Sequence, residues 1–229
     1  MTKNEVLRQL EKLGTAQNRK VYTRHGVSGP AFGVSQANLG KLKKQIKVDH
    51  DLAVELWATG NHDARVLATM IADPACLSAS QLETWSRDLD NYVLTDALAG
   101  LAARSPAASQ LMQRWTKAKG EWIGAAGWNI LAFSLRDRPE LSNTDLEGFL
   151  DRIEAEIHAA KNRTRYAMNN VLIGIGIHNA VLEKKALAAA KRIGKVEVDH
   201  GETGCKTPDA AAYIKKTVEY RRKKQKTSA

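Results

Sequence analysis

The sequence lacks the features of a secreted or membrane-spanning protein. Its 229 residues include only two cysteines, Cys76 and Cys205, which are too few for a disulfide framework and are typical of a reducing compartment. The longest apolar stretch covers residues 171–177, whereas a transmembrane helix needs about 20 apolar residues. Residues 1–14 are charged and helix-patterned, without the apolar core of a signal peptide. We therefore expect a cytoplasmic protein that makes no contact with a membrane.

The motifs of several common enzyme classes are also missing. The chain contains no GxGxxG segment, P-loop, HExxH or GxSxG motif. Asp199, His200, Glu202 and Cys205 are potential metal ligands, but their spacing matches no standard zinc pattern, which pairs cysteines or histidines two to four residues apart. We interpret this segment as a polar connecting loop, and we expect neither a metal nor another cofactor.

The chain carries an excess of positive charge. Lys and Arg total 35 against 25 Asp and Glu, which gives a formal net charge of +10. A basic surface attracts polyanions, of which nucleic acid is the most common partner. More than half of the excess lies in residues 215–226, which we interpret as a solvated basic tail. The rest of the chain is only mildly basic.

Apolar residues recur at helical spacing along nearly the whole chain, and no stretch is strand-like. Leu146, Phe149, Leu150 and Ile153, for example, form one apolar stripe of an amphipathic helix. The pattern predicts helices near residues 3–13, 35–47, 49–59, 62–72, 79–86, 89–103, 107–117, 120–136, 144–160, 164–178, 180–192 and 208–222.

The predicted helix starts carry capping signals. Ser35 fits an N-cap, because a serine hydroxyl accepts a hydrogen bond from a free backbone N–H of the first turn. Residues 80–83 and 144–147, each with a hydroxyl first and a glutamate last, fit capping boxes. Ser105-Pro106 and Thr207-Pro208 place proline at the first helical position, where its missing N–H costs nothing.

A dozen helices joined by short turns favour antiparallel pairs stacked as a solenoid over a compact bundle. Repeats of the HEAT type are degenerate in sequence, with a period of roughly 40 residues. Gly174 and Gly176 weaken an apolar helix by up to about 1 kcal/mol each and are best explained by close helix packing. We predict an all-α, HEAT-like repeat α-solenoid with a concave groove over residues 1–207. A C-terminal helix and the basic tail follow over residues 208–229.

Three stretches carry a resemblance to a known family. They are Tyr22–Ile46, with Phe32-Gly33-Val34 before a basic helix; Glu55-Leu56-Trp57, with the helix after it; and the turn Trp85–Val93. In this order and spacing they resemble the DNA alkylation repair family, the HEAT-like repeat DNA glycosylases, over roughly residues 22–193. The resemblance implies a helical solenoid that binds duplex DNA in its groove and releases N3- or N7-alkylated purines.

The resemblance also implies roles for individual residues. Asp90, five residues after Trp85, matches the catalytic aspartate of the family, with Asp88 as the alternative. By helical spacing alone, Asp96 lies about two turns past Asp90 on the helix that follows, and we assign it a supporting role at most. The chain departs from the family pattern where Ser86 replaces a tryptophan, Ala125 replaces an arginine that contacts the DNA backbone, and Asn170 replaces a further tryptophan.

Excision of an alkylated base needs a carboxylate, aromatic walls and cations that hold phosphates. The sugar approaches an oxocarbenium ion, so a nearby carboxylate stabilises charge in the transition state, and aromatic faces add to that effect. The candidate aromatic side chains are Trp85, Tyr92 and Trp128; the candidate cations are Arg87, Lys117, Lys119, Arg163 and Arg165; and Asn170 is a candidate hydrogen-bonding group in the groove.

Each assignment has a structural alternative. Trp85 also fits a core ring at a helix junction, and Asp88 or Asp90 also fits an N-cap. Three functions therefore stay open. The first is an alkylpurine DNA glycosylase, which the resemblance favours; the second is a catalytically inactive module for branched or distorted DNA; the third is a protein-binding helical scaffold. The expected partner in the first two is damaged or distorted double-stranded DNA, and we expect a monomer.

Overall fold

The computed structural model of the protein describes residues 1–137 and 141–227. Within these ranges it contains thirteen α-helices, one short 3-10 helix and no strand. In chain order the helices are α1 (Lys3–Leu13), α2 (Ala16–Arg24), α3 (Gln36–Ile46), α4 (His50–Trp57), α5 (His62–Ile71), η1 (Pro74–Cys76), α6 (Ala79–Ser86), α7 (Tyr92–Ala102), α8 (Ala108–Trp115), α9 (Glu121–Asp137), α10 (Asn143–Glu156), α11 (Asn162–His178), α12 (Glu183–Ile193) and α13 (Ala210–Thr227).

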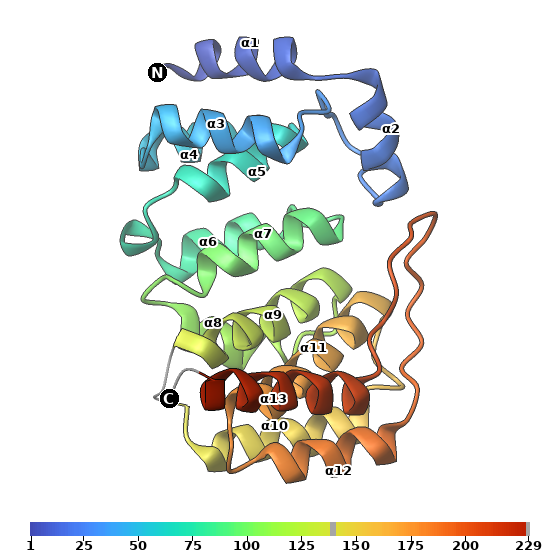
Figure 1. Cartoon of the computed structure of the whole chain (residues 1–229). Helices are drawn as coiled ribbons and strands as arrows, with labels where there is room; N and C mark the ends of the chain where they lie inside the picture. The colour runs from blue at the N-terminus through green and yellow to red at the C-terminus, as the bar shows by residue number, and fades with distance from the viewer. Residues whose placement is uncertain (138–140, 228–229) are drawn as a thin grey trace.

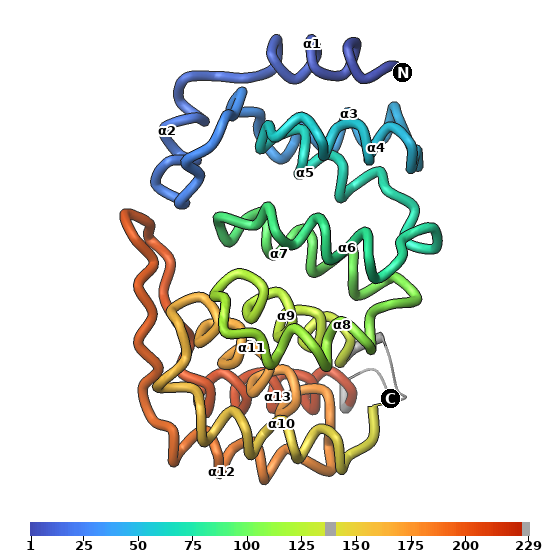
Figure 2. The backbone as a smooth tube through the Cα atoms, turned by 180° about the vertical axis from the view of Figure 1, so that it is seen from behind, coloured from blue at the N-terminus to red at the C-terminus, as the bar shows by residue number. Residues whose placement is uncertain are grey.

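The helices stack in two layers, as Figures 1 and 2 show. We call α5, α7, α9 and α11 the inner layer, because each packs on the next in chain order. The outer layer consists of α4, α6, α8 and α10, each joined by a short turn to the inner helix that follows it. At the C-terminal end α12 packs on α10 and α11, and α13 packs on α11 and α12. The predicted all-α stack of antiparallel helix pairs is confirmed.

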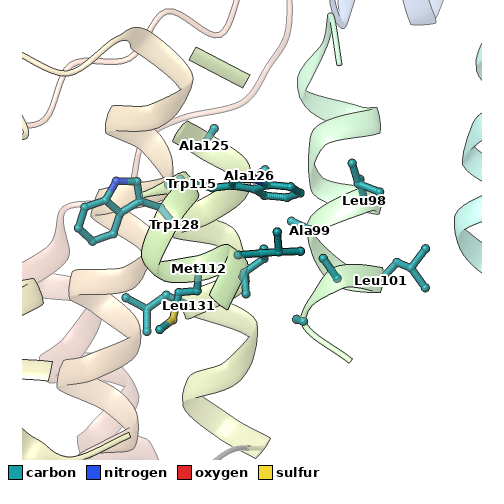
Figure 3. Packing of buried hydrophobic residues seen from close by; sticks show 14 of the residues in the cluster. Leu98, Ala99, Leu101, Met112, Trp115, Ala125, Ala126, Trp128 and Leu131 are labelled. Atoms are coloured by element: carbon teal, nitrogen blue, oxygen red, sulfur yellow. The ribbon is translucent and has the colours of Figure 1, made fainter. Parts of the chain in front are cut away.

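The core lies between the two layers. Figure 3 shows Trp115 and Met112 of α8 beside Ala126 of α9 and Leu98 of α7, and all four side chains are buried. A side chain at Gly127 would place its Cβ 2.8 Å from the Cβ of Trp115, closer than packed carbon atoms approach. Glycine at this position therefore lets α9 approach α8.

The two glycines of α11 serve close packing, as predicted. A Cβ on Gly174 would lie 2.6 Å from Cδ1 of Leu135 in α9. A Cβ on Gly176 would lie 2.6 Å from Cδ1 of Ile214 in α13. The helix-weakening cost of each glycine is therefore offset by contact with a neighbouring helix.

The sequence patterns missed one helix, α2, because none of its residues is buried and it therefore has no apolar stripe. Several predicted caps were also displaced. Ser78 caps α6 instead of Ser80, and Ser142 with Asp145 forms the capping box of α10. The two prolines lie ahead of their helices: Pro106 precedes α8, and Pro208 precedes Asp209, whose carboxylate accepts from the N–H of Ala212 in α13.

A buried carboxylate attaches the N-terminal segment to the stack. Asp63, in the first turn of α5, is 0% exposed. Its two oxygens accept hydrogen bonds from the backbone N–H groups of Phe32 (2.7 Å), Gly33 (3.0 Å) and Val34 (2.8 Å) and from the hydroxyl of Tyr22 (3.0 Å). Burial near this carboxylate raises the pKa of Tyr22, so the phenol keeps its proton and donates. Asp63 thus fixes both α2 and the loop before α3.

The segment 194–209, which we call the arm, connects α12 to α13 without regular structure. It extends along the stack toward α2 (Figures 1 and 2). Asn162 holds it through two hydrogen bonds of 2.7 Å to the backbone of Asp199. At the far end, a Cβ on Gly201 would lie 3.6 Å from the carbonyl oxygen of Arg24. The arm therefore spans from the last helices to the second one.

No helix within the two described ranges combines the length and apolar character that crossing a bilayer requires.

Replacement of Asp63 by alanine should lower the free energy of unfolding by roughly 3 kcal/mol or more, because it leaves buried backbone donors without an acceptor. Urea denaturation measures the change. Asp49→Ala is the control, since Asp49 accepts one hydrogen bond as the N-cap of α4 and its loss should cost about 1 kcal/mol. Equal losses for the two variants would contradict the anchoring role of Asp63.

Candidate nucleic-acid interface

One edge of the stack collects the turns that lead from the outer to the inner layer. These turns cover residues 58–61, 87–91, 116–120 and 157–161, and we call them together the turn edge. Because the inner helices run in the same direction, their N-termini lie at this edge, where backbone N–H groups attract negative charge. The arm is the corresponding connection between α12 and α13. All the site residues expected from the sequence lie at or near this edge or on the inner helices.

Trp85 lies in the core rather than at the surface. It is 4% exposed, and its ring stacks on that of Trp57 with centroids 4.3 Å apart and an interplanar angle of 2°. This matches the structural alternative for Trp85, a core ring at a helix junction. Its aromatic face is occupied by another protein side chain and does not line a DNA-binding surface.

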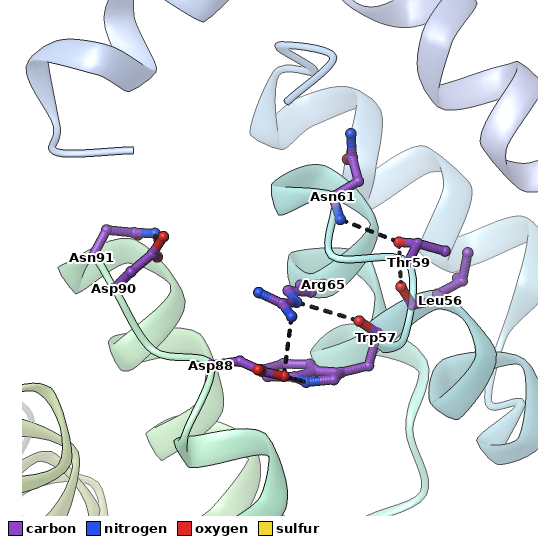
Figure 4. Close-up of polar contacts among 8 residues, drawn as sticks. All are labelled: Leu56, Trp57, Thr59, Asn61, Arg65, Asp88, Asp90 and Asn91. Atoms are coloured by element: carbon purple, nitrogen blue, oxygen red, sulfur yellow. Dashed lines mark hydrogen bonds and ion pairs between the residues drawn. The ribbon is translucent and has the colours of Figure 1, made fainter. Parts of the chain in front are cut away.

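Asp88 is part of a closed polar network (Figure 4). Its Oδ2 atom accepts from Nε1 of Trp57 at 2.8 Å and pairs with Arg65 at 3.0 Å. Arg65 also donates from Nε to the carbonyl of Trp57. The network joins the turn before α7 to the preceding helix pair, so Asp88 has a structural function.

Asp90 is exposed at the turn edge. Its Oδ1 atom accepts from the side-chain amide of Asn91 at 2.6 Å, and Oδ2 lies 3.9 Å from the position a Cβ on Gly29 would take. The cap of α7 is Asn91, whose Oδ1 accepts from the N–H of Leu94. Asp90 is therefore not the N-cap of α7. Its proposed catalytic role stays a prediction.

A second carboxylate, Asp96, lies one helical turn beyond Tyr92 on α7. Its side chain is exposed, although neighbouring protein atoms reduce the hydration of the carboxylate. Its Oδ1 atom accepts a hydrogen bond from Nδ2 of Asn129 at 2.7 Å. Reduced hydration raises the pKa of Asp96 to about 6, outweighing Arg163 and the Asn129 hydrogen bond, which both lower it. Perturbed carboxylates are concentrated at functional sites. The signal in the sequence was the spacing of Tyr92 and Asp96, which places them on one helix face.

Tyr92 and Arg163 form a contact between α7 and α11. The guanidinium carbon of Arg163 lies 3.8 Å from the ring centre of Tyr92 and 5.0 Å from that of Tyr166. The hydroxyl of Tyr92 hydrogen-bonds Nδ1 of His25, at the end of α2, and burial raises the pKa of this phenol. Tyr166 meets the ring of His200 in the arm edge to face, at 5.3 Å. Arg163 thus covers the ring of Tyr92, within a chain of contacts from α2 to the arm.

Trp128 is buried as well. It is 1% exposed, with Arg152 5.1 Å from its ring centre and Phe149 in an edge contact at 5.7 Å. Figure 3 places it between α9 and the helices that follow. It therefore offers no free aromatic face.

Apart from Arg163, the candidate cations fall into two groups. Arg165 donates to the carbonyl oxygens of Glu197, His158 and Ala160, so it holds the arm and the turn before α11. Arg87, Lys117 and Lys119 are exposed on the turn edge and form no ion pair with any described residue.

Lys161 belongs to the same exposed group, although the sequence patterns did not select it. Lys117, Lys119 and Lys161 line one cavity of about 550 Å³ between the turns before α9 and α11. Asn170, on α11, is half-buried and has no hydrogen-bond partner among the described residues.

The described part of the chain contains no group of three or more His, Cys, Asp or Glu side chains arranged to hold a metal ion. In the arm, Oδ1 of Asp199 accepts from the N–H of Gly201, and His200 contacts the hydroxyl of Thr207. Asp199 and His200 are thus engaged in contacts within the arm.

The chain is similar to known proteins over nearly its whole length. A sequence profile described as DNA alkylation repair enzyme matches residues 6–217. An uncharacterized protein of Listeria innocua serovar 6a is 32% identical over 215 residues, which cover 91% of this chain and 93% of that protein. An uncharacterized protein of Listeria monocytogenes serovar 1/2a is 31% identical over 215 residues, with the same coverage.

A solved structure is also similar to this chain, with a TM-score of 0.89 and 32% sequence identity over 97% of this chain and 96% of that one. It represents a new family of proteins related to the HEAT-like repeat DNA glycosylases with affinity for branched DNA structures. The predicted HEAT-like fold is therefore confirmed.

The pKa of Asp96 gives a prediction for stability. Because the folded pKa is raised above that of the unfolded chain, an ionised Asp96 destabilises the fold as pH rises through about 4 to 6, and the penalty is complete above that range. Asp96→Asn should therefore raise the melting temperature at pH 8 and leave it unchanged at pH 4. Thermal unfolding of both proteins at the two pH values measures this. An increase of the same size at pH 4 would show that the carboxylate is not the cause.

Proposed function

The chain belongs to the DNA alkylation repair enzyme family. We propose that it binds double-stranded DNA with a preference for branched junctions and that it does not excise bases. The contact surface is the turn edge together with the exposed face of the inner layer. The similar solved structure, which has affinity for branched DNA, supports the choice of ligand.

The distribution of paired and unpaired charges carries the proposal. On and beside the outer layer, several cations are paired with carboxylates: Arg114 with Glu83, Arg192 with Glu154 at 2.5 Å, and Lys185 with Glu147 at 3.4 Å. On the turn edge, the exposed cations Arg87, Lys117, Lys119 and Lys161 have no carboxylate partner among the described residues. An unpaired exposed cation is free to release counterions from DNA when it contacts a phosphate.

The positions of the aromatic side chains argue against base excision. Trp85 and Trp128 are both in the core, and Arg163 covers the ring of Tyr92. None of these three rings therefore presents a free face to an oxocarbenium-like sugar. Binding by phosphate contacts requires no such face.

One observation favours a second candidate function, alkylpurine excision. Asp96 lies on the exposed side of the inner layer with a raised pKa, which is a property of many catalytic carboxylates. In this case Asp96 rather than Asp90 would stabilise the positive charge of the sugar.

Replacement of both Lys117 and Lys119 by alanine should weaken binding to a four-way junction. It should also reduce the slope of log affinity against log salt by about 2, since each phosphate contact contributes about 0.9. Fluorescence anisotropy over a salt series measures both. The control is Lys184→Ala with Lys191→Ala, which removes the same charge from two exposed lysines of α12. The same loss of slope in the control would show a non-specific effect of net charge.

A base-release assay separates the two candidate functions. The protein should release no 7-methylguanine from alkylated duplex DNA above the rate without protein. Release by the wild type that is lost in Asp96→Asn would favour excision through Asp96. Release lost only in Asp90→Asn would restore the assignment made from the sequence.

A further inference from the structure

Phe133 is a large apolar side chain that the fold leaves open. It lies in α9 and is 47% exposed. By contrast, Trp115 of α8 and Trp128 of α9 are buried, and Trp122 of α9 is half-buried. Gly127 marks the side of α9 that faces the outer layer, through its contact with Trp115. At 100° per residue, Asn129 and Phe133 point away from that side. The ring therefore lies on the exposed face of the inner layer.

The adjacent helix leaves space beside this ring. A Cβ on Gly100 of α7 would meet only Phe133, at 3.7 Å from Cε2 and 4.0 Å from Cζ, which is ordinary contact. A glycine inside a helix costs about 1 kcal/mol relative to alanine, and packing does not require one here. Gly127, by contrast, is required by the contact between α8 and α9. The missing side chain at Gly100 keeps the surface beside Phe133 open.

Polar groups border the ring on the same face. Asp96 and Asn129 lie one turn before Gly100 and Phe133, and they are joined by one hydrogen bond of 2.7 Å. That bond uses Oδ1 of Asp96 and Nδ2 of Asn129, so Oδ2 of the exposed Asp96 and the amide oxygen of the buried Asn129 have no partner among the described residues. One turn after Gly100, Arg104 is exposed and donates from Nε to the carbonyl of Gly100. An aromatic face therefore lies among hydrogen-bonding groups and a cation.

We propose that Phe133 is a stacking platform for an unpaired nucleobase at the branch point of the bound DNA, with the exposed Asp96, held by the buried Asn129, facing its polar edge. The proposal rests on the proposed binding of branched DNA. A nucleobase combines an apolar face with a polar edge, whereas an apolar peptide side chain would leave the second oxygen of Asp96 without a hydrogen-bond donor. Bases at a branch point lose stacking neighbours, and an aromatic ring replaces them.

Photo-crosslinking tests the platform directly. A three-way junction and a gapped linear duplex each carry one unpaired 5-iodouracil, and mass spectrometry locates the crosslinked residue. The expected crosslink is to Phe133 in both DNAs. Phe133→Ala should abolish it and weaken binding to the unpaired-base junction at least about fivefold, with little change for fully paired duplex. Phe133→Tyr should retain both properties.

Two controls complete the experiment. Val54→Ala shortens an exposed apolar side chain of α4 in the outer layer and should change neither readout. Phe133→Leu keeps an apolar side chain without a ring, and it should behave like Phe133→Ala.

The possible results separate the two proposals. One result is equal affinity for junction and linear duplex, with the Phe133 crosslink present in the gapped duplex. It would refute the junction preference but support the role of Phe133 as a stacking platform. A second result is a preference for junctions with a crosslink to another residue and full affinity in Phe133→Ala. It would overturn the stacking role of Phe133 and leave the proposed binding of branched DNA intact. Equal weakening of Phe133→Ala on paired and unpaired DNA would also overturn the stacking role, because the ring would then be a general contact.

Discussion

The position of the N-terminal segment depends on one buried carboxylate. Asp63 gathers three backbone N–H groups and one phenol around two oxygen atoms, in a place from which water is excluded. A buried carboxylate is stable only when its hydrogen-bonding capacity is filled, so the loop over residues 32–34 must follow its outline. Gly33, with a φ of 82°, supplies the backbone conformation that this loop requires. Because the loop is fixed, α2 brings His25 to Tyr92, although α2 itself buries no residue.

A series of side-chain contacts links α2, near the start of the chain, to the arm, near its end. The series starts with the hydrogen bond between His25 of α2 and Tyr92 of α7. Arg163 of α11 then contacts the rings of Tyr92 and Tyr166, and Tyr166 contacts His200 in the arm. These rings and the guanidinium are engaged with one another. The cations that stay unpaired lie on the turn edge. The geometry is consistent with a surface that holds DNA by its phosphates.

The candidate site shows how far reasoning from the sequence reached. Local signals selected the turn before α7 as a candidate site, because Trp85, Asp88 and Asp90 lie together in a short segment that starts a helix. They did not rank its carboxylates, since the environment of each is set by distant residues. Asp88 is held by Trp57 and Arg65, and Asp96 meets Asn129 across 33 positions of sequence. Phe133 was overlooked because nothing in the sequence distinguishes an exposed ring from a core ring at helical spacing.

The sequence by itself determined an all-α stack of helix pairs and the family resemblance, because helical periodicity, turns and the order of short motifs are local properties of the chain. Only the tertiary structure decided which rings are buried and which charges are paired. Trp85 is in the core because Trp57, 28 positions earlier, stacks on it. Arg165 is engaged because the arm returns to it, whereas Lys117 and Lys119 form no ion pair with any described residue. Burial and pairing depend on residues far apart in sequence, so they follow from the packing of the helices.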